Sequence, residues 1–161
     1  MLALFAAANI QAQDKPLCSL LTASDVAAVG ATGQGIETSL PYNNGPNGSG
    51  TMKMCNWRMS NGGIHMMVVK VPPNASREQL KAVMNQSLAA LKAKGWAEEK
   101  QDFGGIACSL MTPPAKEQDA PLTTGCMTEA KGMAISIGTL SRTRVPMEKV
   151  KALVDAVAGR L

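Results

Sequence analysis

The chain has 161 residues, of which 45% are hydrophobic and 3% aromatic, and its formal net charge is +4 at pH 7. This length suits one domain with a packed core, and this apolar content argues against intrinsic disorder. No aromatic residues alternate with the basic ones, whose nearest approach to a patch is Arg142, Arg144, Lys149 and Lys151. We therefore expect no nucleic-acid partner and at most a weak association with a membrane surface.

Residues 1–12 are apolar and carry no charged side chain. The stretch is shorter than the ~20 residues that span a bilayer. Its end, Ile10-Gln11-Ala12, resembles the small-residue cleavage site of a secretory signal, although no basic segment precedes it. We expect residues 1–12 to be a truncated export signal and residues 13–161 to be a single domain. The alternative is a short N-terminal helix in a cytosolic protein.

Three helices are predicted along the chain. Thr22 and Asp25 have the form of a capping box, which predicts a helix from residue 22 to about Gly30. A second helix is predicted over 77–94 from apolar residues at helical spacing. A third is predicted to begin at Pro146, because proline is favoured in the first turn, and its buried stripe consists of Val150, Leu153, Val154, Val157 and Leu161.

Strands are predicted between the helices, at 51–60, 63–71, 96–103, 106–112, 122–130 and 133–140. The dipeptide Asn61-Gly62 predicts a tight hairpin with positive φ at both central positions, and Lys131-Gly132 predicts a second turn. The polar residues 43–50 and the proline-rich residues 112–121 are predicted to be loops. This order predicts an α+β fold, a mainly antiparallel sheet with three helices packed on one face.

Four cysteines, Cys18, Cys55, Cys108 and Cys126, are widely spaced in the sequence. Structural zinc sites bring their ligands in close pairs and redox sites use Cys-x-x-Cys, so this spacing argues against both. An even count behind an export-like leader predicts two disulfides and a periplasmic or secreted location. Of the three possible pairings we favour Cys108–Cys126, because these residues flank one loop on neighbouring predicted strands, which leaves Cys18–Cys55.

His65 is the only histidine, so any hydrolase chemistry of the Ser-His-Asp or Cys-His type must depend on it. It lies in a predicted strand beside apolar residues, a position more typical of a partly buried structural histidine. No carboxylate pair and no phosphate-binding loop stands out, so the sequence identifies no catalytic residue and no cofactor.

A different hypothesis concerns copper. Met52, Met54 and Met59 lie across the predicted hairpin from His65, Met66 and Met67, and thioethers with an imidazole suit Cu(I) in an oxidising compartment. Strand alternation places Met59 on the opposite face from Met52 and Met54, so only part of this group can converge. The copper candidates are thus Met52, Met54, His65 and Met67, although methionines at strand spacing more often belong to a core.

Two short motifs carry a family resemblance. The segment from Pro16 to Val26, with its Cys-x-Leu-Leu-Thr helix start, and the later Cys55-Asn-Trp57 resemble an uncharacterised family of bacterial envelope proteins and lipoproteins. The resemblance covers residues 16–70. It implies a Cys18–Cys55 disulfide, an α+β fold similar to PsbP-like domains and a non-catalytic binding or assembly role. The chain differs from the family in its second cysteine pair and in lacking an evident lipobox.

From these observations we expect an exported, non-catalytic binding or accessory protein of the cell envelope, whose partner is an envelope protein or a small ligand. The alternatives are a Cu(I)-binding periplasmic protein that uses the methionines and His65, and a hydrolase dependent on His65. The expected contact surface is the sheet face left uncovered by the helices, together with loops 43–50 and 112–121. The sequence favours no particular oligomeric state.

Overall fold

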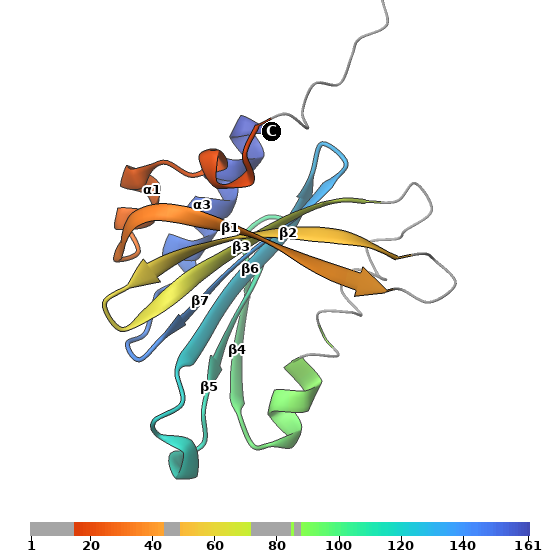
Figure 1. Ribbon diagram of the computed structural model, residues 1–161. Coiled ribbons are helices and arrows are strands. Elements are labelled where there is room, and N and C mark those ends of the chain that lie inside the picture. Colours follow the sequence, from red (N-terminus) through yellow and green to blue (C-terminus); the bar gives the residue numbers. More distant parts are fainter. Residues whose placement is uncertain (1–14, 44–48, 72–84, 86–87) are drawn as a thin grey trace, which may run out of the picture.

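The computed structural model describes residues 15–43, 49–71, 85 and 88–161 (Figure 1). The strands form one antiparallel sheet of seven in the order β1-β2-β3-β7-β6-β5-β4. Their bounds are β1 Ala31–Asn43, β2 Ser49–Met59, β3 Gly62–Lys70, β4 Ala97–Asp102, β5 Ala107–Thr112, β6 Leu122–Ala130 and β7 Met133–Ser141. The helical elements are η1 Leu17–Leu20, α1 Ala23–Ala27, η3 Ala115–Glu117 and α3 Met147–Arg160, and residues 88–93 are also helical. The fold is therefore α+β, and the sheet dominates it.

The sheet consists of two meanders joined side by side. Strands β1, β2 and β3 pair in chain order, and so do β4, β5, β6 and β7. The two meanders meet where β3 pairs with β7, from Gly62 opposite Ser141 to Lys70 opposite Met133. This long-range pairing places the start of β3 beside the end of β7, although about eighty residues separate them in the sequence.

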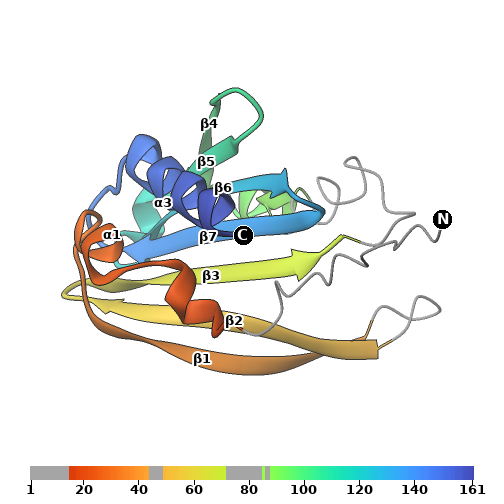
Figure 2. The same cartoon turned by 90° about the horizontal axis from the view of Figure 1, so that it is seen from above.

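The main core lies between one face of the sheet and the helices α1 and α3, which lie in front of the strands in Figure 2. Alternate residues of the central strands point into it and are almost fully buried: Cys55, Trp57, Ile64, Met66, Ile135 and Ile137. The predicted stripe of α3 packs onto them through Val150, Leu153, Val154 and Val157, while Leu161 is partly buried against the same core. We call this side of the sheet the covered face.

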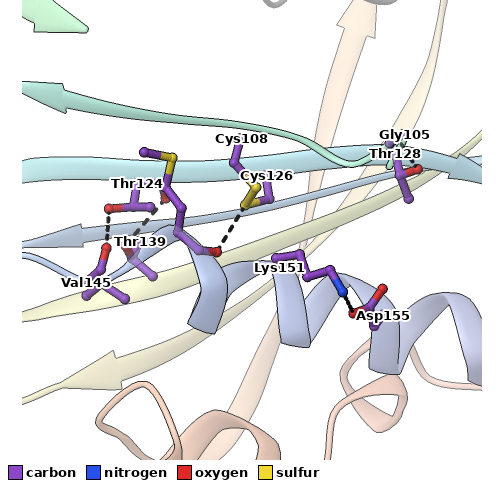
Figure 3. The surroundings of a disulfide bond; sticks show 10 residues. Gly105, Cys108, Thr124, Cys126, Thr128, Thr139, Val145, Lys151 and Asp155 are labelled. Atoms are coloured by element: carbon purple, nitrogen blue, oxygen red, sulfur yellow. Dashed lines mark hydrogen bonds and ion pairs between the residues drawn. A yellow bond between two sulfur atoms is a disulfide. The ribbon is translucent and has the colours of Figure 1, made fainter. Parts of the chain in front are cut away.

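The polar side chains in this core are also satisfied. Thr124 Oγ1 donates a hydrogen bond to the carbonyl oxygen of Val145 at 2.8 Å, and Thr139 Oγ1 donates to the carbonyl oxygen of Thr124 at 3.4 Å (Figure 3). The bond to Val145 holds the segment that leads into α3 against β6. Burying these threonines therefore leaves neither hydroxyl unpaired.

The two disulfides join the pairs that the sequence favours. Cys18–Cys55 links η1 to β2 with a Cα–Cα distance of 5.4 Å, and Cys108–Cys126 links directly opposed residues of β5 and β6 with a Cα–Cα distance of 4.1 Å. Figure 3 shows the second bond beside the first turn of α3, where Cys126 Sγ lies 3.6 Å from the carbonyl oxygen of Met147. The closures over 37 and 18 residues contribute about 4 and about 3 kcal/mol in the chain-entropy model.

The prediction that all helices pack on one face is wrong. Residues 88–93 lie behind the sheet in Figure 2, opposite α3. Lys92 of this segment forms an ion pair with Glu98, which stands opposite Met111 in the β4–β5 register. Met111 points away from the covered face, since its neighbour Leu110 belongs to the main core, yet Met111 is 0% exposed. A second, smaller buried region therefore covers this end of the other face.

Strand β1 was not predicted from the sequence. Its residues are mostly polar and include Pro41, a composition compatible with an edge strand, which pairs on one side only. Gly35 is needed there because a Cβ at this position would lie 2.5 Å from Cys55 Sγ and 2.7 Å from the Trp57 ring. Strand β1 thus lies close to the Cys18–Cys55 disulfide. Its sequence lacks the hydrophobic alternation from which a strand can be predicted.

The β2–β3 hairpin differs from its prediction by one residue. Met59 pairs with Gly62, so the two turn residues are Ser60 and Asn61, and neither has positive φ. Gly62 is required for another reason: a Cβ there would lie 1.8 Å from the carbonyl oxygen of Leu140 in β7. The predicted turn at Lys131 and Gly132 is confirmed, with φ of 51° and 73°.

Helices α1 and α3 begin within one residue of the positions that the sequence predicts. The capping box of α1 is formed, because Thr22 Oγ1 accepts from Asp25 N–H and an Asp25 carboxylate oxygen accepts from Thr22 N–H. Helix α3 begins at Met147, one residue after the predicted Pro146. Most of the predicted helix 77–94, the predicted export signal 1–12 and residues 44–48 of the predicted loop lie outside the described residues.

Candidate functional site: the open face of the sheet

The face of β1, β2, β3 and β7 opposite α1 and α3 is the candidate site, and we call it the open face. Its residues follow from the register: Met54 stands opposite Thr38 and Met67, while their neighbours Cys55 and Met66 point into the main core. In the described part of the chain, four large hydrophobic side chains are classed as exposed, and all four lie on this face. They are Ile36 at 59%, Leu40 at 41%, Val69 at 37% and Leu140 at 44%.

His65 occupies the middle of the open face. It stands opposite Gly138 of β7, and a Cβ on Gly138 would lie 2.3 Å from His65 Nε2, so the imidazole ring lies over this glycine. Burial lowers the pKa of His65, which keeps the ring neutral at pH 7. Within the residues that the structure describes, His65 has no hydrogen-bonded hydroxyl or carboxylate partner. The geometry therefore gives no support to a Ser-His-Asp arrangement.

The four copper candidates share the open face but do not all converge. Met54 and Met67 are direct cross-strand partners, and Met52 lies two residues further along β2 on the same face. The ring of His65 instead extends over β7, away from these thioethers. Among the described residues there is also no group of three or more His, Cys, Asp or Glu side chains that could hold a metal ion.

A hollow of about 480 Å³ lies where the open face meets the β2–β3 turn. The backbone of Gly62 and Gly63 contributes to it, and Arg58 of β2 and Arg142, which follows β7, line it together with His65 and Leu140. Asp119 and Pro121 belong to the loop between β5 and β6, which corresponds to the predicted loop 112–121, and they also line the hollow.

The basic residues near the C-terminus do not form one patch. Arg142 lines the hollow on the open face, whereas Arg144 binds Glu99 on the side of the covered face at 2.7 Å. Lys151 pairs within α3 with Asp155 at 2.6 Å. The hollow was not predicted from the sequence, because its two arginines lie far apart in the chain. The consecutive glycines Gly62 and Gly63 are the signal that could have indicated it.

Comparisons with protein-family models, with curated proteins and with solved structures found no match to this chain. Among the described residues, no helix has the length and apolar character needed to cross a membrane. The open face and the two disulfides are the features of the described chain that bear on its function.

Proposed function

We propose that this protein is an exported, non-catalytic binding or accessory protein of the bacterial cell envelope, and that it binds an envelope protein or a small ligand through the open face. One observation carries the proposal: the four exposed large hydrophobic side chains of the described chain all lie on that face. Hydrophobic side chains exposed singly are ordinary on a protein surface, whereas their grouping on one face is typical of an interaction site.

The disulfides support the export part of the proposal. Both bonds are compatible with an oxidising location outside the cytoplasm. Cys55, Cys108 and Cys126 are at most 4% exposed, so these disulfide-bonded residues are part of the core. We propose a periplasmic or secreted location on this basis.

The proposal includes the relationship to the envelope-protein family and to PsbP-like domains. Its support is the pair of motifs on which the resemblance rests, because Cys18 of the helix start is bonded to Cys55 of the Cys-x-Trp strand. The dominance of an antiparallel sheet with α3 across one face is compatible with such a module.

A pull-down from envelope extract tests the role of the open face. Substituting Ile36→Glu together with Leu40→Glu should abolish partner capture, since it places two charges in an apolar contact surface. The melting temperature should change by about 2 °C or less, because both side chains are exposed. Ala152→Glu on the exposed side of α3 is the matched control and should leave capture intact. Unchanged capture by the double variant would contradict the proposal.

Cu(I) binding is a second candidate function, favoured by the placement of Met52, Met54 and Met67 on one face. Titration with Cu(I) against a competing chelator should give binding tighter than micromolar, which Met54→Leu and Met67→Leu weaken. Met59→Leu is the control, because Met59 packs against the main core on the other face. Binding of micromolar affinity or weaker excludes this function.

A further inference from the structure

We propose that the hollow beside the β2–β3 turn binds an oxyanion, a carboxylate or phosphate group, carried by a small ligand with an apolar body. Arg58 and Arg142 are the residues that hold the oxyanion. This inference rests on the proposed function, since it names a ligand class for one end of the open face.

The register places the two arginines on the same face. Arg58 stands opposite Gly63, which in turn stands opposite Leu140 of β7. Arg142 lies two residues after Leu140. Its backbone N–H donates a hydrogen bond to the carbonyl oxygen of Asn61 at 3.2 Å, so Asn61 and Arg142 continue the alignment of β3 with β7 by one residue pair. One strand therefore lies between the arginines. Their Cα atoms are separated by two strand spacings, about 10 Å, across the sheet and by two residues, about 7 Å, along it.

The strand between them carries no side chain beside Arg58, where Gly63 stands, while Asn61 stands beside Arg142 and also lines the hollow. Gly62 is fixed by the approach of the Leu140 carbonyl oxygen, and a Cβ on Gly63 would lie 3.1 Å from the carbonyl oxygen of Trp57. Long guanidinium side chains on both sides of a bare backbone can reach the same group above it. This is the arrangement in which two arginines bind one carboxylate or phosphate by forked hydrogen bonds.

The ion pairs of the described arginines also support an oxyanion site at the hollow. Four arginines lie in the described part of the chain, and two are bound elsewhere: Arg144 by Glu99, and Arg160 by Asp25 and the carbonyl oxygen of Leu20. The other two, Arg58 and Arg142, have no ion pair with any described residue, and both line the hollow. Asp119 is the acidic residue lining it, so the hollow keeps a positive balance.

Other residues that line the hollow are suited to contact the apolar part of the ligand. Leu140 is 44% exposed at the hollow, and Pro121 lies on its rim. His65 is neutral because burial lowers its pKa, so it adds a polarisable surface without a further charge. A volume of about 480 Å³ falls in the range of sites for small ligands.

Octanoate and 1-octanol distinguish this proposal from simple apolar binding. Calorimetry should show saturable octanoate binding with Kd below about 1 mM, and octanol should bind at least about tenfold more weakly, as expected for loss of a charge-assisted hydrogen bond. Since His65 is the only histidine, its ring proton resonances report occupancy at the hollow without further assignment. Equal affinity for the alcohol and the acid would overturn the proposal, and so would the absence of saturable binding to any oxyanion probe.

Variants of the two arginines locate the site. Arg58→Gln and Arg142→Gln should each weaken octanoate about tenfold or more, while Asp119→Asn should tighten it about threefold by removing a like charge. Arg144→Gln is the matched control, because that arginine lies on the other face, and should leave the affinity unchanged. Unchanged binding by the Arg58→Gln, Arg142→Gln double variant would overturn the proposal.

The source of the oxyanion is tested with inorganic phosphate and with vesicles of phosphatidylglycerol or phosphatidylcholine. Binding to phosphatidylglycerol alone, lost in the double arginine variant, assigns the site to a lipid headgroup. Octanoate or phosphate binding without vesicle binding assigns it to a free ligand. If every probe fails while Ile36→Glu with Leu40→Glu still abolishes partner capture, the open-face proposal stands and the oxyanion site is rejected.

Discussion

Consecutive residues of β3 have contrasting surroundings on the two faces of the sheet. Ile64 and Met66 are at most 2% exposed beneath the helices, whereas His65 and Met67 are only partly buried and Val69 is 37% exposed. The strand is apolar on both faces, which is typical of a strand covered on both sides. The described residues cover only one side of β3 fully, and the other side belongs to the open face, which we propose contacts a partner.

The two faces also differ in how β7 is built. On the covered face it contributes Ile135 and Ile137, both 0% exposed. On the open face it contributes Ser136 and Gly138, and the small size of Gly138 allows the ring of His65 to lie across the strand. The isoleucines of β7 therefore fill the core on one side. On the other side Gly138 leaves space for the His65 ring, and the large side chain of Leu140 is exposed.

Removing the disulfides should give the largest effects, because both act on the covered face. Cys18→Ala with Cys55→Ala should lower the free energy of unfolding by about 4 kcal/mol, and Cys108→Ala with Cys126→Ala by about 3 kcal/mol, since the first closes the longer loop. Urea unfolding measures both values. Peptide mapping without reductant should recover 18–55 and 108–126, and recovery of 18–126 would contradict this pairing.

Adjacent methionines of β3 give the sharpest comparison of the two faces. Met66→Ala should lower the free energy of unfolding by about 3 kcal/mol, because it leaves a cavity in a fully buried site. Met67→Ala makes the same chemical change on the open face and should cost about 1 kcal/mol or less. Similar losses in the two variants would mean that both faces are packed alike.

Gly138→Ala should perturb the open face at one point. The new Cβ would overlap the His65 ring, so the free energy of unfolding should fall by about 1–3 kcal/mol or the ring must move outward. As the ring leaves its buried position, the pKa of His65 should rise toward its ordinary value, which NMR titration measures. Gly125→Ala on β6 is the control, since the nearest atom to its Cβ is 3.9 Å away. An unmoved pKa with unchanged stability would show that the ring does not lie over Gly138.

The smallest effect is expected for the ion pair between Asp25 and Arg160, which joins α1 to α3. The hydrogen bond from Arg160 lowers the pKa of Asp25 from 3.8 to about 2, against the opposing effect of burial and with help from Thr22. A carboxyl whose pKa is lowered by folding stabilises the protein above its unfolded pKa, and this contribution is lost as the pH falls from about 4 to about 2.

Arg160→Gln should therefore cost about 1 kcal/mol at pH 7, a value discounted for the partial exposure of the pair, and much less at pH 2. Lys151→Gln, which breaks only the pair with Asp155 within α3, should cost about 0.5 kcal/mol or less. Urea unfolding at both pH values gives the comparison, and a loss for Arg160→Gln that persists at pH 2 would assign its role to the bond with Leu20.

Much of the covered face could be predicted from local sequence. The capping box at Thr22, the strand 122–130, the turn at Lys131 and the stripe of α3 all follow from periodicity and turn chemistry within short segments. Strand β1 could not, because a polar edge strand lacks alternation and takes its place from pairing with β2. The helical state of residues 88–93 was predicted but their side of the sheet was predicted wrongly, since an amphipathic stripe does not say which side of a sheet it covers.

The open face was predictable only in part. Alternation alone places Met52 and Met54 together, and the hairpin adds Met67. The hollow depends on the pairing of β3 with β7, which brings Arg142 near Arg58 across Gly63. That contact joins two meanders, and nothing in the local sequence of either specifies it.

We propose that the open face is accessible to a partner, whereas helices cover the opposite face of the same strands. Hydrogen peroxide footprinting of the native protein tests it directly, because oxidation of methionine follows its exposure. Met67 should form the sulfoxide about tenfold faster than Met66, its neighbour in the same strand. Equal rates for the two methionines would contradict the account.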